Sequence, residues 1–377
     1  MAAVQEMNIA GEVVITGPSV KEEGGVANYL ASILPELGQG ATHLIVGNRS
    51  HENGNKLLRL VKDYLSFIRL VRNKSVRLVH VNPSLVPASI LRDSIYVFLA
   101  RLYSKKTFVF FHGWDRDFAE TCGQGFWGLF LRRILKADAI AVLANEFKSK
   151  LLDWEYKGKM LNETMLVGET LFNYEISEAV DKNTNTPKVL FLSRIEETKG
   201  IYQTIDACKI LRGKYSGLKL IVAGNGSIEK QVRDQCSGEK WIEFTGYVRG
   251  EQKKELYYTS DLYLFPTYYP EGMPNSVLEA MATGLPVVTR PVGGLADFFD
   301  TDKMGALTDS LDPEVIAAEC DRLLADPAKM NEISLYNIQY AHDRFLVSNV
   351  ARRLVSIYNS LIEEKQQSTV TAKSVNA

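Results

Sequence analysis

The sequence predicts an α/β protein of two doubly wound domains, each a parallel sheet flanked by helices. Strand and helix signals alternate along nearly the whole chain, which is typical of parallel sheets. The length of 377 residues suits two domains at the usual size of about 150 residues each. A polar run over residues 178–187 separates the two series. Ligands of such sheets bind outside the carboxyl ends of the strands, so we expect the active site in a cleft between two facing domains.

Each half of the chain contains five predicted strands. In the first half they span residues 13–16, 43–46, 78–82, 107–111 and 139–143, with the clearest helices at 26–37, 56–72, 88–103, 128–136 and 146–154. In the second half the strands span 188–193, 218–223, 242–245, 261–266 and 285–289, and helices follow most of them. The predicted domains are residues 1–175 and 176–345. A C-terminal helix (346–364) that packs back toward the first domain and a disordered polar tail (365–377) complete the chain.

The composition argues against several classes of protein. A net charge of −1 gives no reason to expect nucleic acid as a partner. The four cysteines lie far apart without a C-x-x-C spacing, and they are expected to be reduced packing residues of a cytosolic protein. The N-terminus shows no cationic start followed by an apolar run, and no window reaches the ~18 apolar residues of a membrane span. The protein is therefore expected in the cytoplasm.

Two glutamates flank the start of one helix in the second half. Glu271 stands at the mouth of the loop after the strand at 261–266, and Glu279 lies about one turn into the helix that follows. Asn275 and Ser276 are good N-cap residues for this helix, which ends at Gly284. A helix N-terminus favours an anion. Carboxylates on both sides of it suit a ligand with phosphate at its centre and hydroxyl-rich groups at its ends, such as a nucleotide-sugar.

Other candidate residues stand at the ends of predicted strands. Arg194 and Lys199 follow the strand at 188–193, where they can grip a diphosphate, although either cation alone is more often solvated surface. His112 follows the strand at 107–111 and can hydrogen-bond a reacting sugar or a leaving phosphate; the alternative is a histidine satisfied by backbone. Asp115 and Asp117 form a D-x-D that would suggest a metal. We reject a metal site, because Arg194, Lys199 and a helix N-terminus already supply the countercharge.

Glycine turns between strands and helices are the remaining candidates. Gly24 and Gly25 precede the first helix, where they let a phosphate approach backbone N–H groups. Gly224, in VAGNGS, and Tyr247 and Val248, in TGYV, can wall a base pocket. The alternative is that all of these turns serve only the α/β fold, since neither G-x-G-x-x-G nor a Walker loop is present.

Taken together, these residues resemble the retaining glycosyltransferases of family 4, which have the GT-B architecture. The E-x(7)-E element of that family is matched by Glu271 and Glu279, and its R-x(4)-K-G by Arg194, Lys199 and Gly200. The resemblance covers the second half almost throughout and is thinner in the first. It implies two facing Rossmann-like domains, with the acceptor on the first and the nucleotide-sugar on the second.

The resemblance also implies roles for the candidate residues. Glu271 would contact the donor sugar's hydroxyls, Glu279 the ribose, and His112 the sugar near the reacting carbon. Arg194 and Lys199 would hold the diphosphate, helped by N–H groups of Gly25 and of the turn Met273, Pro274, Asn275 and Ser276. Three departures from the family stand out. Tyr174 follows Asn173 in the crossover, Asp297 replaces a frequent glutamate, and the loop after Glu271 reads Gly-Met-Pro-Asn.

The predicted function is transfer of a sugar, with retention, from a UDP- or GDP-sugar to a hydroxyl of a glycan or lipid-linked acceptor. Cell-surface polysaccharide or glycolipid synthesis is the expected setting, with no metal and no cofactor beyond the donor. The alternatives are a GT-B sugar-nucleotide epimerase and a non-catalytic nucleotide-sugar-binding protein. A nucleotide-dependent oxidoreductase is disfavoured because its glycine fingerprint is absent.

A basic segment predicts contact with the inner face of a membrane. From Lys56 to Lys106 the chain carries eleven basic and two acidic residues, a net charge of 11 − 2 = +9. Basic residues alternate there with an apolar stripe at helical spacing, and a second candidate lies at 126–136; the stripes comprise Leu57, Leu60, Tyr64, Phe67 and Ile68, and Phe126, Trp127, Phe130 and Leu131. Such helices can lie on anionic bilayers. The alternative is a core-packing stripe with a solvated basic rim.

Overall fold

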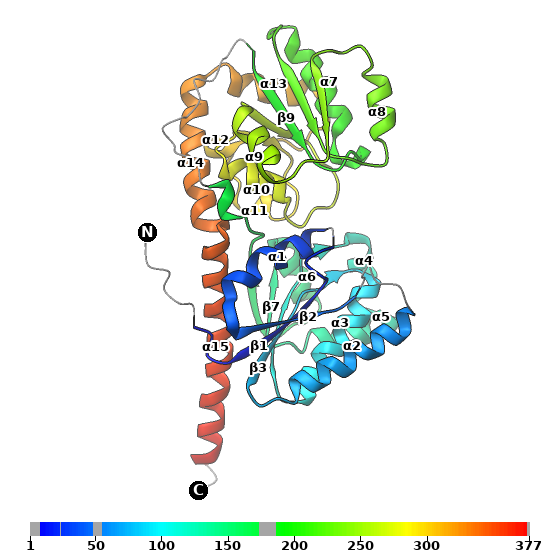
Figure 1. The fold of residues 1–377 in the computed structure, drawn as a ribbon, viewed down its shortest axis with the longest axis vertical. Coiled ribbons are helices and arrows are strands. Elements are labelled where there is room, and N and C mark those ends of the chain that lie inside the picture. The colour runs from blue at the N-terminus through cyan, green and yellow to red at the C-terminus, as the bar shows by residue number, and fades with distance from the viewer. Residues whose placement is uncertain (1–7, 23, 48–54, 173–185, 375–377) are drawn as a thin grey trace. The chain divides into compact units, whose positions relative to one another are not determined.

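The computed structural model describes residues 8–22, 24–47, 55–172 and 186–374 of the chain (Figure 1). They form two compact units, residues 1–165 with 347–377, and residues 166–346. The first unit thus ends before the boundary predicted at residue 175. Asn173, Tyr174 and most of the predicted linker, residues 178–185, lie outside the described residues.

The first unit is built on a six-stranded parallel sheet in the order β2-β1-β3-β5-β7-β8. Most positions of β1, β3, β5 and β7 are buried, because helices cover both faces of a parallel sheet. A two-residue parallel pair, β4 with β6, lies beside the main sheet. The strands are β1 (Glu12–Gly17), β2 (Ala41–Ile45), β3 (Val76–Val81), β4 (Ser84–Leu85), β5 (Lys106–Phe110), β6 (Gly113–Trp114), β7 (Ala139–Val142) and β8 (Lys159–Asn162).

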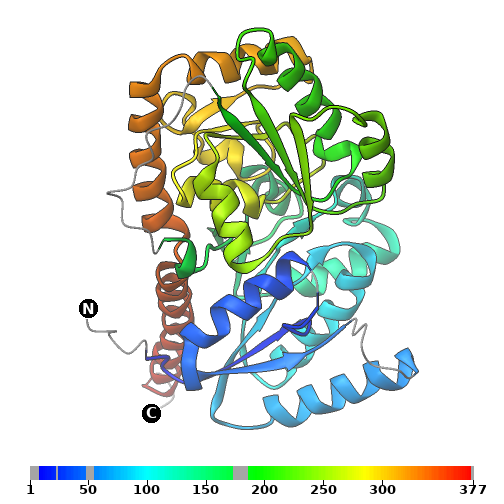
Figure 2. The same ribbon diagram turned by 45° about the horizontal axis from the view of Figure 1, so that its top comes forward.

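The helices of the first unit form two layers. In Figures 1 and 2, α1 and α15 lie side by side, and α15 also contacts β3 and β5. Right-handed crossovers place α2, α3 and α5 on the other face, where α3 contacts both of its neighbours. The helices are α1 (Gly25–Leu37), α2 (Lys56–Val71), α3 (Pro87–Leu102), α4 (Arg116–Thr121), α5 (Gly125–Ile134), α6 (Asn145–Asp153) and α15 (Val347–Ser374), with a 3-10 turn at Gly38–Gly40.

Polar contacts as well as apolar packing join α15 to the first unit. The Tyr358 hydroxyl lies 2.7 Å from Nδ1 of His80, and both residues are buried. Arg353 donates to the Glu163 carboxylate at 3.2 Å and to the Thr164 hydroxyl at 3.0 Å. The helix extends to Ser374, past residue 364, after which the sequence predicted a disordered tail.

The second unit contains another six-stranded parallel sheet, in the order β11-β10-β9-β12-β13-β14. Its strands are β9 (Lys188–Leu192), β10 (Lys219–Ala223), β11 (Ile242–Gly246), β12 (Leu262–Phe265), β13 (Val287–Thr289) and β14 (Gly305–Leu307). Its helices are α7 (Ile201–Arg212), α8 (Glu229–Gln235), α9 (Gly250–Thr259), α10 (Asn275–Ala282), α11 (Leu295–Phe298), α12 (Thr301–Met304), α13 (Pro313–Leu324) and α14 (Pro327–Phe345), with 3-10 turns at Glu169–Leu171 and Glu197–Lys199.

The structure adds detail that the hydrophobic pattern did not predict. Each sheet has a sixth strand, β8 or β14, at its edge. β8 is half exposed and β14 is three residues long, so neither has a clear strand pattern. The C-terminal part of the chain forms three successive helices, α13, α14 and α15. Pro327 starts α14, because proline fits the first helical turn but not a helix interior.

Candidate functional site

The site of the second unit lies where the winding of its sheet reverses. β9 and β12 are neighbours, and the chain proceeds outward from them in opposite directions. In open α/β sheets, ligands bind outside the carboxyl ends of the strands at this point. Arg194 and Lys199 follow β9, and Glu271 follows β12. The topology therefore brings Glu271 to Lys199, which lies 72 positions earlier in the chain, and to the neighbouring Arg194.

Lys199 and Glu271 are joined by an ion pair at this edge. Lys199 Nζ donates to Glu271 Oε1, and the two side chains are only 5% and 16% exposed. Lys199 Nζ also lies 3.9 Å from the centre of the Tyr269 ring, and the Arg194 guanidinium carbon lies 5.8 Å from the same ring centre. The pKa of Lys199 is lowered by burial, and the Glu271 carboxylate offsets part of this effect by raising it. Two cationic groups, those of Arg194 and Lys199, thus lie around the Tyr269 ring.

A glycine after Lys199 lets the two strand ends approach closely. Gly200 has a φ of 81° and begins α7 as its N-cap. A Cβ at this position would lie 2.4 Å from the carbonyl oxygen of Pro266, at the end of β12. Only glycine meets both conditions. The Lys-Gly pair in the sequence therefore has a structural reason beside the proposed ligand contact.

Both carboxylate oxygens of Glu279 are held by residues of α9. Lys253 Nζ donates to Oε1 at 2.7 Å, and the Tyr257 hydroxyl donates to Oε2 at 3.0 Å. Tyr257 is fully buried, and its hydroxyl also lies 3.2 Å from the carbonyl oxygen of Ser276. Burial and then the charge of Glu279 raise the pKa of Tyr257 well above its ordinary value. The phenol therefore remains a hydrogen-bond donor.

The residues predicted to cap α10 are not its N-cap. The helix begins at Asn275, so its N-cap is Pro274, and no side chain caps the first turn. Asn275 and Ser276 are instead the first two helical residues, whose N–H groups have no partner within the helix. Met273 is buried and Pro274 lacks an N–H group. The N–H groups at the start of this helix are thus those of Asn275 and Ser276, beside the N–H of Met273.

The predicted base-pocket residues lie at the ends of β10 and β11. Gly224 has a φ of 135°, and a Cβ there would lie 1.9 Å from the carbonyl oxygen of Ser193, next to Arg194. Its N–H donates to the carbonyl oxygen of Gly246 at 2.8 Å. Tyr247 is 63% exposed, whereas Val248 is buried. These contacts explain the glycine by packing, and Tyr247 keeps an accessible ring near the same sheet edge.

In the first unit, Gly24 and Gly25 form the start of α1. Gly24 is the N-cap with a φ of 134°, which requires glycine. A Cβ at Gly25 would have no heavy atom within 4 Å, and its φ lies outside the left-handed region. Neither packing nor backbone conformation therefore demands glycine at Gly25. Close approach of a ligand to its N–H group remains a reason for that residue.

His112 is a buried, neutral side chain at the end of β5. Its ring lies 4.6 Å from the Tyr29 ring and 4.1 Å from the Phe110 ring, and burial lowers its pKa to about 3. Nε2 lies 2.8 Å from Oδ1 of Asn82, whose Nδ2 donates to the carbonyl oxygen of Thr16 at 3.0 Å. That second bond fixes the orientation of the amide, so Nε2 carries the proton. Nδ1 is then an acceptor, with no partner in the part of the chain that the structure describes.

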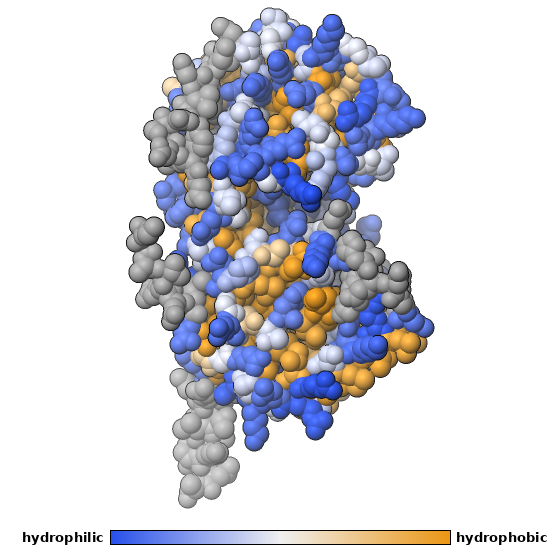
Figure 3. All heavy atoms as spheres, viewed as in Figure 1, coloured by the Kyte–Doolittle hydropathy of each residue, from blue (hydrophilic) through white to orange (hydrophobic). Residues whose placement is uncertain are grey.

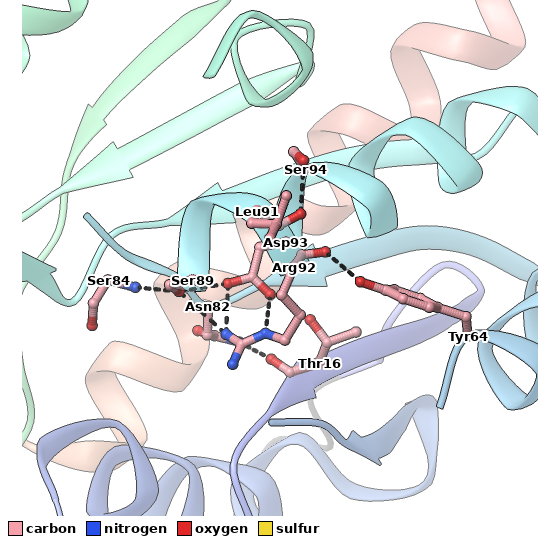
Figure 4. A network of polar contacts seen from close by, with 9 residues as sticks. All are labelled: Thr16, Tyr64, Asn82, Ser84, Ser89, Leu91, Arg92, Asp93 and Ser94. Carbon is pink, nitrogen blue, oxygen red and sulfur yellow. Dashed lines mark hydrogen bonds and ion pairs between the residues drawn. The ribbon is translucent and has the colours of Figure 1, made fainter. Parts of the chain in front are cut away.

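A buried ion pair stands beside Asn82 (Figure 4). Arg92 binds Asp93 through Nε and Nη2, each at 2.7 Å, and Asp93 is 1% exposed. Asp93 also accepts from the Ser89 hydroxyl at 2.7 Å, and Ser89 accepts from the Ser84 N–H at 3.1 Å. This network ties the start of α3 to the segment that follows β3. Asn82 itself is bonded to Thr16 of β1 and follows β3, where the winding of the first sheet reverses.

The D-x-D sequence has a structural role. Asp115 is the N-cap of α4 and accepts from the N–H of Phe118 at 2.9 Å. No cluster of three metal-ligating side chains occurs among the described residues. The four cysteines Cys122, Cys208, Cys236 and Cys320 are buried free thiols.

Comparison with protein families identifies the second unit. The model of the glycosyl transferases group 1 matches residues 173–340. The chain carries a glycosyltransferase group 1 domain. Its Arg194, Lys199, Glu271 and Glu279 all lie within the matched range.

Relatives of this glycosyltransferase group 1 domain are themselves named glycosyltransferases. The amylovoran biosynthesis glycosyltransferase AmsK of Erwinia amylovora is 25% identical over 85% of this chain and 79% of its own. An uncharacterized glycosyltransferase of Methanocaldococcus jannaschii is 30% identical over 46% of this chain and 45% of its own. The chain thus aligns with less than half of the archaeal relative. Other relatives include a putative colanic acid biosynthesis glycosyltransferase of Salmonella typhimurium.

Solved structures show that the fold is GT-B, with two Rossmann-like domains. HepE of Anabaena, solved with UDP and glucose, has a TM-score of 0.72 at 15% identity, over 93% of this chain and 100% of its own. Sucrose-phosphate synthase of Thermosynechococcus elongatus has a TM-score of 0.70 at 17% identity, over 94% and 100%. The predicted fold class is confirmed.

Four residues around these sites were missed by sequence reasoning. Lys253, Tyr257 and Tyr269 surround the two glutamates of the glycosyltransferase group 1 domain, and Asn82 holds His112. Lys253 and Tyr257 are four positions apart, so one face of α9 carries both. That spacing was a usable signal, but nothing in the sequence connects α9 with Glu279.

Proposed function

We propose that this protein is a retaining, metal-independent glycosyltransferase of the hexosyltransferase type. It would move a sugar from a UDP- or GDP-sugar to a hydroxyl of a glycan or lipid-linked acceptor, in cell-surface polysaccharide or glycolipid biosynthesis. The observation that carries the proposal is the Lys199–Glu271 pair beside the Tyr269 ring, at the carboxyl ends of β9 and β12. The names of AmsK and of the colanic acid relative support the biosynthetic setting. The complexes of HepE with UDP and with UDP-glucose support the donor class.

In this proposal the diphosphate binds to fixed positive groups. Arg194 and Lys199 donate charge-assisted hydrogen bonds to it, and the N–H groups at the start of α10 add the positive end of a helix dipole. Lys199 has three donor positions and Glu271 occupies one of them, so the ammonium can bind the carboxylate and a phosphate oxygen together. Gly25 contributes a further N–H group to the phosphate.

Glu271 orients the sugar, and the diphosphate is the leaving group. The bond between the anomeric carbon and the diphosphate oxygen breaks through an oxocarbenium-like transition state. The acceptor oxygen then forms its bond from the same face, and its proton passes to the departing diphosphate. Charge grows on the diphosphate as this happens, so Arg194 and Lys199 stabilise the transition state more than the ground state.

His112 contributes a neutral group in this mechanism. Because its pKa is about 3, the imidazole is uncharged at neutral pH and cannot neutralise a phosphate. Its one proton lies on Nε2, toward Asn82, which leaves Nδ1 as an acceptor. We therefore assign it a hydrogen bond accepted from a sugar hydroxyl near the reacting carbon. Glu279 binds the ribose hydroxyls of the donor.

Product analysis tests the proposed reaction. The purified protein is incubated with a panel of UDP- and GDP-sugars and with glycan or lipid-linked acceptors, and products are analysed by mass spectrometry and proton NMR. We expect a new glycoside with the anomeric configuration of the donor, formed equally well in chelator. An inverted product, an epimerised nucleotide-sugar without glycoside, or complete loss of activity in chelator would each contradict a part of the proposal.

We also propose that the first unit docks on an anionic bilayer, the inner face of the cytoplasmic membrane. Nine large apolar side chains of α2, α3 and α5 are 39–68% exposed: Leu57, Leu58, Val61, Leu65, Leu91, Phe98, Leu102, Phe126 and Leu129. We call these nine residues the apolar face of the first unit. Figure 3 shows hydrophobic atoms along the lower edge of the molecule, where Figure 1 places α2. Exposed patches of this kind mark interaction sites.

The charge around the apolar face fits an anionic surface. Lys62, Arg69 and Arg72 are exposed on α2, on the same side as Val61 and Leu65. The two acidic residues of the basic segment, Asp63 and Asp93, are buried, so neither offsets these cations at the surface. A basic rim on an apolar helical face is the pattern of helices that lie in a bilayer interface.

The structure corrects which residues form this face. The predicted stripe included Phe67 and Leu131, which are fully buried or nearly so, at 0% and 1% exposure. Phe67 packs against the Tyr96 ring of α3, with ring centres 4.8 Å apart. The exposed apolar residues of α2 lie on its opposite side. Within the described residues, no helix is long and apolar enough to cross a membrane.

A further inference from the structure

Glu279 has a hydrogen-bond arrangement that leaves room for two more donors. An ionised carboxylate offers about four acceptor positions, two on each oxygen. Lys253 takes one position on Oε1, and Tyr257 takes one on Oε2. Counting the described residues, one position therefore remains on each oxygen. A ribose presents two vicinal hydroxyl donors, which match this pattern.

The two donors also fix the rotation of the carboxylate. A glutamate side chain has a broad, nearly two-fold terminal torsion, so one partner would leave the second oxygen loosely placed. Here each oxygen has its own donor, and Tyr257 is fixed by complete burial. Its hydroxyl lies 3.2 Å from the Ser276 carbonyl oxygen, within the helix that carries Glu279. The carboxylate is thus held against its own helix and against α9.

A contribution to folding stability does not explain why a lysine stands at position 253. The side chains of Lys253 and Glu279 are 27% and 17% exposed, and half-exposed ion pairs contribute little to folding. The Ser276 carbonyl oxygen is an alternative acceptor for the single hydroxyl proton of Tyr257, so the burial of Tyr257 does not require Glu279. A lysine directed at a glutamate of the donor site is better explained by the ligand.

We infer that Lys253 and Tyr257 are positioning residues that hold Glu279 ready for the 2′- and 3′-hydroxyls of the donor's ribose. This inference rests on the proposed function, in which Glu279 binds ribose. It makes α9 a third element of the donor site, beside the segments that follow β9 and β12. Lys253 and Tyr257 therefore control how strongly the site prefers ribose over deoxyribose.

Binding of nucleoside diphosphates tests the inference without requiring catalysis. Affinities of the full-length protein for UDP, GDP and their 2′-deoxy forms are measured by calorimetry. The ratio of deoxy to ribo Kd is compared in the wild type, Glu279→Gln, Lys253→Met, Lys253→Arg and Tyr257→Phe. Lys254→Met is the matched control, because Lys254 is the next residue of α9 and is likewise partly exposed. The ratio separates a positioning effect from general electrostatic attraction, because loss of a positive charge weakens the binding of the ribo and deoxy nucleotides equally.

We expect the wild type to prefer the ribonucleotide by about tenfold or more, because the deoxynucleotide lacks one hydroxyl and leaves a partly buried acceptor unpaired. Glu279→Gln and Lys253→Met should reduce that ratio several-fold, Tyr257→Phe should reduce it less, and Lys253→Arg should restore most of it. Lys254→Met should leave it unchanged.

Two contrary results are distinguishable. If Glu279→Gln reduces the ratio but Lys253→Met and Tyr257→Phe do not, the positioning role is wrong and the proposed function stands. If neither nucleoside diphosphate binds, or Glu279→Gln leaves the ratio unchanged, the ribose role of Glu279 in the proposed function is wrong, and this inference is lost with it.

Discussion

The two units place chemically different groups at the points where their sheets reverse direction. In the second unit the candidate residues are charged and already paired, Lys199 with Glu271 and Lys253 with Glu279. In the first unit they are a glycine turn and a neutral histidine whose Nδ1 has no partner among the described residues. The same type of sheet thus carries an electrostatic site in one unit and a neutral, hydrogen-bonding site in the other.

This difference follows from what each unit is proposed to bind. A diphosphate requires fixed positive charge, and the Glu271 carboxylate favours the charged form of the buried Lys199. A sugar hydroxyl requires directional but neutral partners, which a buried imidazole supplies. Variants in the second unit should therefore affect activity most, and variants in the first unit should affect membrane association or pH-dependent stability.

The largest effect is expected from the diphosphate-binding cations. Arg194→Ala and Lys199→Met each remove charge-assisted hydrogen bonds of about 1.5–3 kcal/mol, or roughly 10- to 150-fold in kcat/KM. Lys199→Met should be the more severe, because it also leaves Glu271 unpaired beside the diphosphate. Steady-state kinetics with thermal melts measure this, with Lys254→Ala as the control. Near-normal turnover in both variants would contradict the diphosphate site.

The two glutamates should separate in their kinetics. Glu271→Gln should lower kcat by about tenfold or more, because a small misplacement of the sugar is costly in the transition state. Glu279→Gln should mainly raise the donor KM, since the ribose is bound similarly in the ground and transition states. Glu255→Gln, on the exposed side of α9, is the control. The reverse pattern would exchange the two roles.

A third prediction concerns the apolar face of the first unit. Leu58→Gln with Leu65→Gln should reduce co-sedimentation with anionic vesicles several-fold, and Arg69→Glu with Arg72→Glu should reduce it chiefly at low salt. The matched control is Ile210→Gln with Leu335→Gln, two exposed residues of the second unit at 47% and 57%. If the wild type stays in the supernatant even at low salt, the bilayer proposal is wrong.

The smallest effect should come from the protonation of His112. The pKa of His112 is about 3 in the folded protein, against about 6.5 in the unfolded chain. The unfolded chain binds more protons between these values, so the free energy of unfolding decreases as the pH falls from about 6.5 toward 3. His80, which is also buried with a lowered pKa, contributes in the same direction.

Urea unfolding at pH 4.5 and pH 7.5 measures this dependence. His112→Gln should lose part of it, whereas His342→Gln, an exposed histidine, should not. Nitrogen NMR should find the proton on Nε2, as the bond to Asn82 requires. Asn82→Asp should raise the pKa of His112, since a carboxylate favours the imidazolium. A proton on Nδ1 in the wild type would contradict the assigned acceptor role.

The sequence by itself determined the alternation of strands and helices, and with it two parallel sheets. It also determined the residues at the carboxyl ends of β9 and β12, because strand-to-helix turns are local and marked by glycine and proline. Arg194, Lys199, Glu271 and Glu279 were predicted for this reason. The spacing of residues within one segment depends only on the local sequence, so it could be predicted without knowing how distant segments pack.

Only the tertiary structure decided which groups meet across segments. Lys253 and Tyr257 reach Glu279 from a different helix, and Asn82 reaches His112 from a different strand. α2 has apolar residues on two sides, so its periodicity could not tell the buried Phe67 from the exposed Leu65. Packing against α3 determines which side of α2 is buried. An amphipathic pattern predicts that a helix forms, but it does not predict which neighbouring element covers each side.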